Sequence, residues 1–169
     1  MVIKRVLAAL HAMLTGEDVP ITSLGDLVMF SQTFVDRCHH GKEEMCLFPC
    51  LEQRGIPREG GPIGVMLMEH EMGRRLVRAI EDAVRRHEAG EASRDEVFAR
   101  VREYVDLLEG HILKEEEVLF RMADHVMARD DVQQTVACYE RTEEERAGTG
   151  THERMIAVAE RMERDATGA

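Results

Sequence analysis

Two segments of the sequence, residues 39–48 and 111–120, repeat one another closely. They read HHGKEEMCLF and HILKEEEVLF, so histidine, lysine, two glutamates, leucine and phenylalanine recur at matching positions. In a helix, the histidine and the first glutamate of each copy lie one turn apart on the same side, where both can bind one ion. Two such pairs on facing helices predict a site for two metal ions. This requirement constrains the fold more than any other feature.

The segment that carries the second copy, 94–129, is predicted to be a long helix with one inward seam. Apolar residues follow each other along it at alternating steps of three and four. At the middle of the seam stand His111 and Glu115, where packing alone would favour Leu or Val. The first copy places His39 and Glu43 in the same way. Because an unpaired buried carboxylate is costly, a bound metal explains both seams better than two separate His–Glu hydrogen-bonded networks.

Helix-breaking residues divide the chain into five predicted helices. The chain has no Trp, two Tyr and five Phe, a composition that favours helices over strands. We therefore predict an all-α fold, an up-down four-helix bundle with an additional C-terminal helix, in one domain that spans residues 1–169. The predicted helices are 2–15, 22–54, 63–89, 94–129 and 132–164, with breaks at 16–20, 55–62, 90–93 and 130–131 and a kink at 148–150.

Loop geometry places a third histidine, His70, level with the two pairs. His70 and His111 each lie about 20 residues from the turn near Gly90, which sets them side by side at the helical rise of 1.5 Å per residue. His39 and His70 are similarly placed about the 55–62 connection. Imidazole and carboxylate ligands suit iron, manganese or zinc, and an interior with carboxylates and few thiolates favours iron over structural zinc. The predicted layer consists of His39, Glu43, His70, His111 and Glu115.

Three segments resemble the bacterial hemerythrin-like family, the HHE cation-binding domains. They are HHGKEEMCLFP at 39–49, GPIGVMLMEHEMGR at 61–74 and HILKEEEVLF at 111–120, and the similarity spans nearly the whole chain. The resemblance implies an up-down helical bundle with a non-haem di-iron centre, bridged by carboxylate and an oxo or hydroxo group. By motif match, it implies ligand roles for His39 with Glu43, for His70, and for His111 with Glu115.

The sequence departs from the oxygen-carrying members of that family. The position four after His70 is Arg74 instead of a second histidine. Those members have an aspartate five residues after the histidine that matches His111, whereas this chain has Glu115 four residues after it. No residue of 2–15 matches the family's Glu-His pair, and His11 is expected about three turns away from the metal layer. These departures weaken the case for reversible O₂ carriage.

His152 is the residue that we expect to complete the site, as a ligand or as a group that orients one. Counting back from the turn near Asp130 brings it within about one helical turn of the level of His111. Its GTGTHE context also resembles the family's C-terminal segment. The alternative is that His152 is an exposed helix residue.

Three further polar residues lie next to predicted ligands. His40 is predicted to point about 100° away from His39, and therefore either to contact a ligand from outside or to face solvent. Glu44 and Glu116 have the same relation to the ligand glutamates. We expect them to orient a ligand or to control access to it.

Charge and hydropathy exclude several classes of partner. The net charge of -11 and the lack of a long Lys/Arg cluster argue against nucleic acid and anionic lipid. No apolar run approaches the roughly 18 to 20 residues of a membrane span, and we expect a cytoplasmic protein. No CxxC pair is present, and the cysteines, which are Cys38, Cys46, Cys50 and Cys138, are predicted to be reduced thiols.

These observations favour a non-haem di-iron protein that binds or reacts with O₂, peroxide or nitric oxide. Peroxide disproportionation or nitric-oxide chemistry would make it an enzyme. The alternatives are a non-catalytic iron or oxygen sensor or store, and a bundle in which the metal is structural. A homodimer is left open.

Overall fold

The computed structural model describes residues 2–15, 21, 23–148 and 150–167. Within these residues every regular element is a helix, which confirms the all-α prediction. The elements, with η marking π-helical segments, are α1 (Val2–Thr15), α2 (Ser23–Phe30), η1 (Ser31–His40), η2 (Glu43–Leu47), α3 (Phe48–Gln53), α4 (Pro62–Glu88), α5 (Arg94–Lys114), η3 (Glu115–Leu119), α6 (Phe120–Val126), α7 (Arg129–Arg146) and α8 (Thr151–Thr167).

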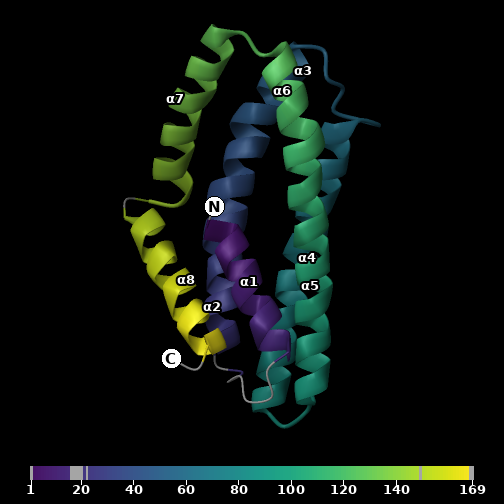
Figure 1. Ribbon diagram of the computed structural model, residues 1–169, viewed down its shortest axis with the longest axis vertical. Coiled ribbons are helices and arrows are strands. Elements are labelled where there is room, and N and C mark those ends of the chain that lie inside the picture. The colour runs from purple at the N-terminus through teal and green to yellow at the C-terminus, as the bar shows by residue number, and fades with distance from the viewer. Residues whose placement is uncertain (1, 16–20, 22, 149, 168–169) are drawn as a thin grey trace.

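Three long helical runs form the body of the molecule (Figure 1). The first joins α2, η1, η2 and α3, the second is α4, and the third joins α5, η3 and α6. Short connections link successive runs, so neighbouring runs are antiparallel. The remaining side is shared by shorter helices, since α1 packs on α5 and α8, α8 also on α2, and α7 on η1 and η2. The expected up-down order is thus visible in three long runs.

The apolar core has two parts, and a polar layer separates them. The larger part involves α1, α2, α8 and the adjoining halves of α4 and α5, with Leu10, Phe30 and Ile80 fully buried. The smaller part lies around Phe48 and Leu119 at the other end. Between them, the same three runs carry buried histidines and glutamates. No helix in the described ranges is long and apolar enough to cross a membrane.

The turn between α4 and α5 sets the height of the polar layer. Gly90 has a φ of 77°, the left-handed conformation that commonly ends a helix. Ser93 then begins α5, because its hydroxyl accepts a hydrogen bond from the Glu96 backbone N–H at 3.2 Å. Since both helices are regular from this turn onwards, His70 and His111 reach the same level. The expected break at 16–20 lies outside the described residues.

The predicted break at residues 130–131 is misplaced. The third run ends at Val126, and α7 begins at Arg129, so that the two aspartates lie in the first turn of a helix. The Asp131 carboxylate accepts a hydrogen bond from the Ala128 backbone N–H at 2.7 Å. Acidic residues favour a helix start, because they satisfy free N–H groups there and complement the helix dipole.

The prediction of four reduced thiols is wrong. Cys46 and Cys138 form a disulfide that joins η2 to α7, whereas Cys38 and Cys50 are free. The bonded residues are 92 positions apart. A search for close cysteine pairs cannot find such a bond, because only the packing of α7 against η2 brings its two halves together.

Candidate metal centre

The five residues predicted to form one layer do lie together. His39 and Glu43 come from the first run, His70 from α4, and His111 and Glu115 from the third run. The side chains of all but one are at most 4% exposed, and the exception, His39, is 23% exposed. The fold thus places polar groups where packing alone would favour apolar ones.

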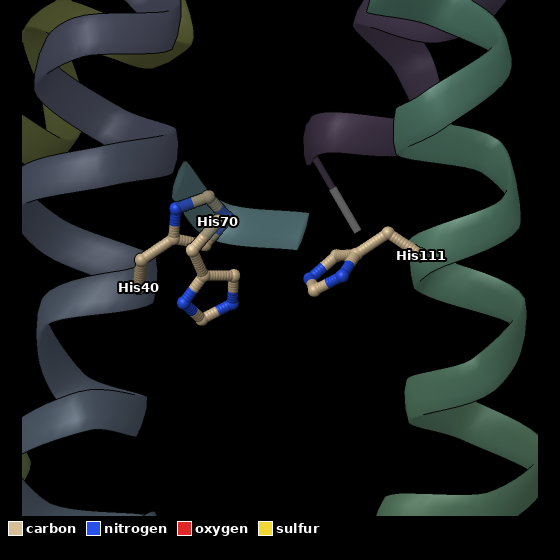
Figure 2. A group of neighbouring side chains, drawn as sticks. All are labelled: His40, His70 and His111. Atoms are coloured by element: carbon tan, nitrogen blue, oxygen red, sulfur yellow. The ribbon is translucent and has the colours of Figure 1, made fainter. Parts of the chain in front are cut away.

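The layer consists of two groups of side chains, each with the spacing of a metal site. One group is His40, His70 and His111, whose ligand atoms lie within 4.8 Å of one another. The His40 and His70 rings stack at 3.7 Å, and His111 faces them from α5 (Figure 2). The prediction that His40 points away is therefore wrong. The ligand atoms of the other group are equally close, and its members are His39, Glu43 and Glu115.

The π-helical winding of η1 explains why His39 and His40 both face the interior. The Gly41 N–H donates to the carbonyl of Asp36, five residues earlier, instead of four as in an α-helix. A turn with more residues has a smaller angle between neighbouring side chains. Adjacent histidines can then enter the two groups side by side. The paired histidines were visible in the sequence, but an α-helical angle of about 100° per residue removes one of them.

The two sequence repeats adopt the same local distortion. The Phe48 N–H donates to the Glu43 carbonyl, and the Phe120 N–H donates to the Glu115 carbonyl, again five residues back. The π segments η2 and η3 therefore each begin at a ligand-type glutamate. Such π turns are rare and occur frequently at functional sites.

The two carboxylates of the second group also lie near histidines of the first group. Glu43 Oε2 is 3.2 Å from His70 Nε2 and 4.0 Å from His39 Nε2. Glu115 Oε1 is 3.8 Å from His111 Nε2 and 3.4 Å from His39 Nε2. Each glutamate can therefore interact with an ion in either group.

The atoms that point into this layer lack hydrogen-bond partners. Among the described residues, the buried side-chain polar atoms without a partner belong to the two groups, apart from Ser31 Oγ. Unsatisfied buried polar atoms are rare and costly in folded proteins, and a coordinated cation satisfies all of these together. The atoms concerned are His39 Nε2, His40 Nδ1 and Nε2, Glu43 Oε1 and Oε2, His70 Nε2, His111 Nε2 and Glu115 Oε1.

Burial and mutual contacts shift the pKa values of several groups in the layer. Burial and the neighbouring Glu115 raise the pKa of Glu43 well above its usual value. Burial opposes ionisation of Glu115 too, but its close contacts with His39 and Glu43 and the charge of the nearby imidazoles lower its pKa to about 2. Burial lowers the pKa of His40 to about 3, so its imidazole is neutral and can bind a metal. Metal binding would displace the proton held by Glu43.

Two carboxylates outside the two groups contact the imidazoles of His70 and His111 at Nδ1, the ring nitrogen that does not point into the layer. Glu44 Oε1 lies 2.8 Å from His70 Nδ1, and Glu69 Oε2 lies 3.1 Å from His111 Nδ1. Lys114 Nζ in turn lies 2.8 Å from Glu69. Such pairs fix the ring orientation and leave Nε2 free to bind metal. The expectation that Glu44 orients a ligand agrees with this contact, whereas sequence reasoning missed Glu69.

Arg74 connects the carboxylates behind two of the histidines. Its guanidinium donates to Asp36 and to Glu44, each at 2.7 Å. Asp36 lies 3.6 Å from His40 Nδ1. Burial raises the pKa of Glu44, but the hydrogen bonds from His70 and Arg74 outweigh it and lower that pKa to about 2. Arg74 therefore keeps two ionised carboxylates in place against the first group.

A cleft between η1, α4 and α5 leads to the first group. Its volume is about 360 Å³. Its buried end includes the three histidines, and exposed Arg37, Arg78 and Glu81 lie at its outer end. Gly73 lines it beside His70, and the walls between are formed by Ser31, Val35, Val77, Tyr104 and Leu108. The cleft therefore runs from the protein surface to the side chains of the imidazole group.

The Tyr104 phenol in this cleft wall predicts a loss of stability at high pH. Burial raises its pKa to about 12, from the usual value near 10. Its contribution is full below pH 10 and is lost as the pH rises through 12, because only the unfolded chain ionises in that range. At about 1.4 kcal/mol per pKa unit, the loss is about 3 kcal/mol. Urea unfolding from pH 9 to 12 should show a smaller loss for Tyr104→Phe; equal losses would contradict this.

The structure does not bring His152 to the layer. It lies on α8 with its side chain 47% exposed, 3.9 Å from Glu143 and against the Phe34 ring. The turn count assumed one kinked helix, but α7 ends at Arg146 and a separate helix, α8, begins at Thr151. This position agrees with the alternative of an exposed helix residue. His11 is also outside the layer, and pairs with Glu109 at 2.6 Å.

Glu116 also lies outside the two groups. Its carboxylate pairs with Lys4 of α1 at 2.5 Å. The contact brings the beginning of α1 beside η3, and so to the level of the layer. The structure thus gives Glu116 a role in packing α1.

Comparison with known families gives one match. A family model described as the hemerythrin HHE cation binding domain matches residues 2–123. The match contains every residue of both groups and ends within α6, so α7 and α8 lie outside it. Comparisons with curated proteins and with solved structures found no match.

Proposed function

The chain belongs to the family of hemerythrin HHE cation-binding domains, and from this we propose that its buried layer binds two iron ions that react with O₂, peroxide or nitric oxide. The observation that carries the proposal is the pair of adjacent ligand groups, in which the two carboxylates lie near histidines of both groups. The unpaired atoms in the layer account for a full set of protein ligands. Folding this layer without a cation would leave them all unsatisfied.

The two ions would have different protein ligands. His40, His70 and His111 would hold one ion, and His39 would hold the other. Glu43 and Glu115 would bind both, since each lies near histidines of both groups. Histidine and carboxylate ligands suit iron, and manganese or zinc would be accepted by the same donors.

Bound iron would supply one-electron redox chemistry and a coordination position for a small molecule. The protein itself would admit the small molecule, orient the imidazole ligands and exclude bulk water. Apolar side chains in the cleft wall exclude bulk water, while the Ser31 and Tyr104 hydroxyls offer hydrogen bonds to a polar diatomic or peroxide. The Ser31 hydroxyl is buried and has no partner among the described residues. The carboxylates behind the imidazoles keep the ligand nitrogens aimed inward.

Metal analysis and optical spectroscopy on one preparation test this proposal. We expect about two irons per chain and a near-ultraviolet absorption of a ferric pair that changes on adding peroxide, O₂ or nitric oxide. Repeated turnover of peroxide would establish an enzyme. A spectrum that responds without turnover would favour the sensor or store. A reproducible single zinc with no optical response would falsify the di-iron proposal.

Gly73 offers a test of the cleft as the route to the metal. A Cβ at this position would lie 3.9 Å from Leu107 Cδ2 and Tyr104 Cε2, which is ordinary contact. Gly73→Ala should therefore be tolerated and should add up to about 1 kcal/mol of helix stability. Gly73→Leu should fill the cleft and slow the reaction with peroxide about tenfold or more at unchanged iron content.

Rapid-mixing kinetics and metal analysis of both variants measure these effects. Gly73→Ala serves as the control for substitution at this backbone position. If Gly73→Leu binds two irons and reacts at the rate of the unmodified protein, small molecules enter by another route.

A further inference from the structure

Three of the cysteines gather at a second place in the fold, on the outer side of η2 and α3. Cys46, Cys50 and Cys138 line one pocket of about 220 Å³ beside α7. Cys46 and Cys138 are bonded to each other, whereas Cys50 is a free thiol. In the described part of the chain, none of them belongs to either metal-binding group.

We propose that Cys46 and Cys138 form a second, thiol-based redox site, which small thiols reduce and peroxides oxidise, and which fastens α7 to the helix that carries the metal ligands. The bond links Cys138 of α7 to Cys46, three residues after Glu43. Its cleavage therefore frees α7 without breaking the three long runs.

The surroundings of the two sulfurs favour thiol exchange. The Thr142 hydroxyl lies 3.3 Å from Cys46 Sγ and 3.9 Å from Cys138 Sγ, so it can donate to whichever sulfur leaves as a thiolate. Arg141 lines the same pocket, and a nearby cation stabilises a thiolate. The pocket's Asp131 is neutralised by an ion pair at 2.7 Å. Cys138 is partly exposed, which gives an attacking thiol access to the bond.

Both directions of the reaction balance. In reduction, a thiolate attacks the Cys138 sulfur, the S–S bond breaks, and Cys46 leaves as a thiolate and takes a proton. A second small thiolate then attacks the small-thiol sulfur of the mixed disulfide, Cys138 leaves as a thiolate and takes a proton, and two small thiols have become one small disulfide. In oxidation, a Cys138 thiolate attacks peroxide and yields a sulfenic acid and water. Attack by the Cys46 thiolate then restores the bond and releases a second water.

The attachment of α7 depends strongly on this bond. Among the described residues, those of α7 that are buried are Thr135 and Thr142, so the helix contributes few apolar contacts. Its charged contacts are those of Glu143 with Lys42 and with His152 of α8, and that of Asp131 with Arg54, whose side chain is 44% exposed. A segment with so few buried contacts opens easily, and a covalent link prevents its departure.

Release of α7 would uncover the side of the metal layer that contains His39. The helix packs against η1 and η2, which carry His39 and Glu43. Tyr139 of α7 packs against the smaller core cluster around Leu119. Burial, together with the charges of Glu43 and Glu115, raises the pKa of the Tyr139 phenol, as expected for a side chain close to those carboxylates.

The Cys46–Cys138 redox site is tested first on metal-free protein, so that the result is independent of the proposed di-iron function. Thiol titration with a chromogenic disulfide should count two free thiols in the oxidised protein and four after reduction with dithiothreitol. Peptide mapping should recover Cys46 joined to Cys138, and equimolar hydrogen peroxide should restore that link. Amide hydrogen exchange in α7 should accelerate about tenfold or more on reduction.

Variants distinguish opening of the Cys46–Cys138 disulfide from a general effect of reduction. Cys138→Ser should show the rapid exchange of α7 under all conditions. Cys50→Ser, a change in the same pocket outside the bond, should keep slow exchange in the oxidised form and rapid exchange in the reduced form. Four free thiols that equimolar peroxide leaves unchanged, recovery of a different cysteine pair, or equal exchange of α7 in both redox states would overturn the proposal.

The link to the metal layer rests on the proposed function and has its own measurement. In iron-loaded protein, dithiothreitol should speed extraction of iron by a chelator about tenfold, and Cys138→Ser should extract at the faster rate without reductant. An unchanged extraction rate, in protein whose α7 does open on reduction, would refute this link.

Discussion

Replacing His111 with asparagine is expected to abolish binding in the imidazole group and to lower the metal content from about two ions per chain to one or fewer. Asparagine can keep a hydrogen bond to Glu69, which lies 3.1 Å from His111 Nδ1, but it removes the inward Nε2. A ligand at a hundred times its dissociation constant adds about 2.7 kcal/mol. The iron-loaded variant should therefore melt about 5 to 10 °C lower than the iron-loaded protein.

The metal-free forms should differ much less in stability, because the lost nitrogen has no partner there. His125→Asn is the matched control, since His125 lies exposed on α6 of the same helical run and bonds the Arg121 carbonyl. Elemental analysis and calorimetry with and without iron measure both effects. Full metal content in His111→Asn would exclude His111 as a ligand.

Replacing Arg74 with alanine should weaken metal binding about 10- to 100-fold while both ions still bind at saturation. The change removes the cation that holds Asp36 and Glu44, each at 2.7 Å. Those carboxylates would then repel each other and release the His40 and His70 rings. Arg74→Lys should recover part of the affinity, because one ammonium cannot bridge two carboxylates as the planar guanidinium does.

Arg75→Ala is the control for the Arg74 variants. Arg75 is the next residue of α4, its side chain is 71% exposed, and its partner is Glu71 at 3.4 Å. Competition with a chromophoric chelator gives the affinity of each protein. Equal affinities of Arg74→Ala and Arg75→Ala would mean that Arg74 does not position the ligands.

The sequence predicted a large part of the candidate metal centre for a simple reason. The spacing of His and Glu within one helix is a local property, so the two repeats indicated four residues of the two groups directly. Helix length and turn position then predicted His70, since the rise per residue is constant. The same reasoning failed for His152, because the prediction treated two separate helices as one kinked helix.

His40 was missed because π-helical winding cannot be read from apolar spacing. The α-helical angle excludes one of two adjacent histidines, whereas the five-residue hydrogen bonds in η1 admit both. Glu69 and the role of Arg74 were missed for a different reason. Each acts through a side chain from another helix, and that contact exists only after the helices pack.

The sequence by itself determined that this chain is helical, that His and Glu pairs occupy inward seams, and that three helices share one polar layer. These properties follow from local periodicity and from constant helix geometry. The tertiary structure alone decided that His39 and His40 enter separate groups, that the carboxylates of one group lie near histidines of the other, and that Arg74 binds the Asp36 and Glu44 carboxylates beside the imidazole group. It also decided the pairing of Cys46 with Cys138 across 92 residues. Such contacts depend on how helices turn and pack against each other, a long-range property that residue spacing within one helix does not specify.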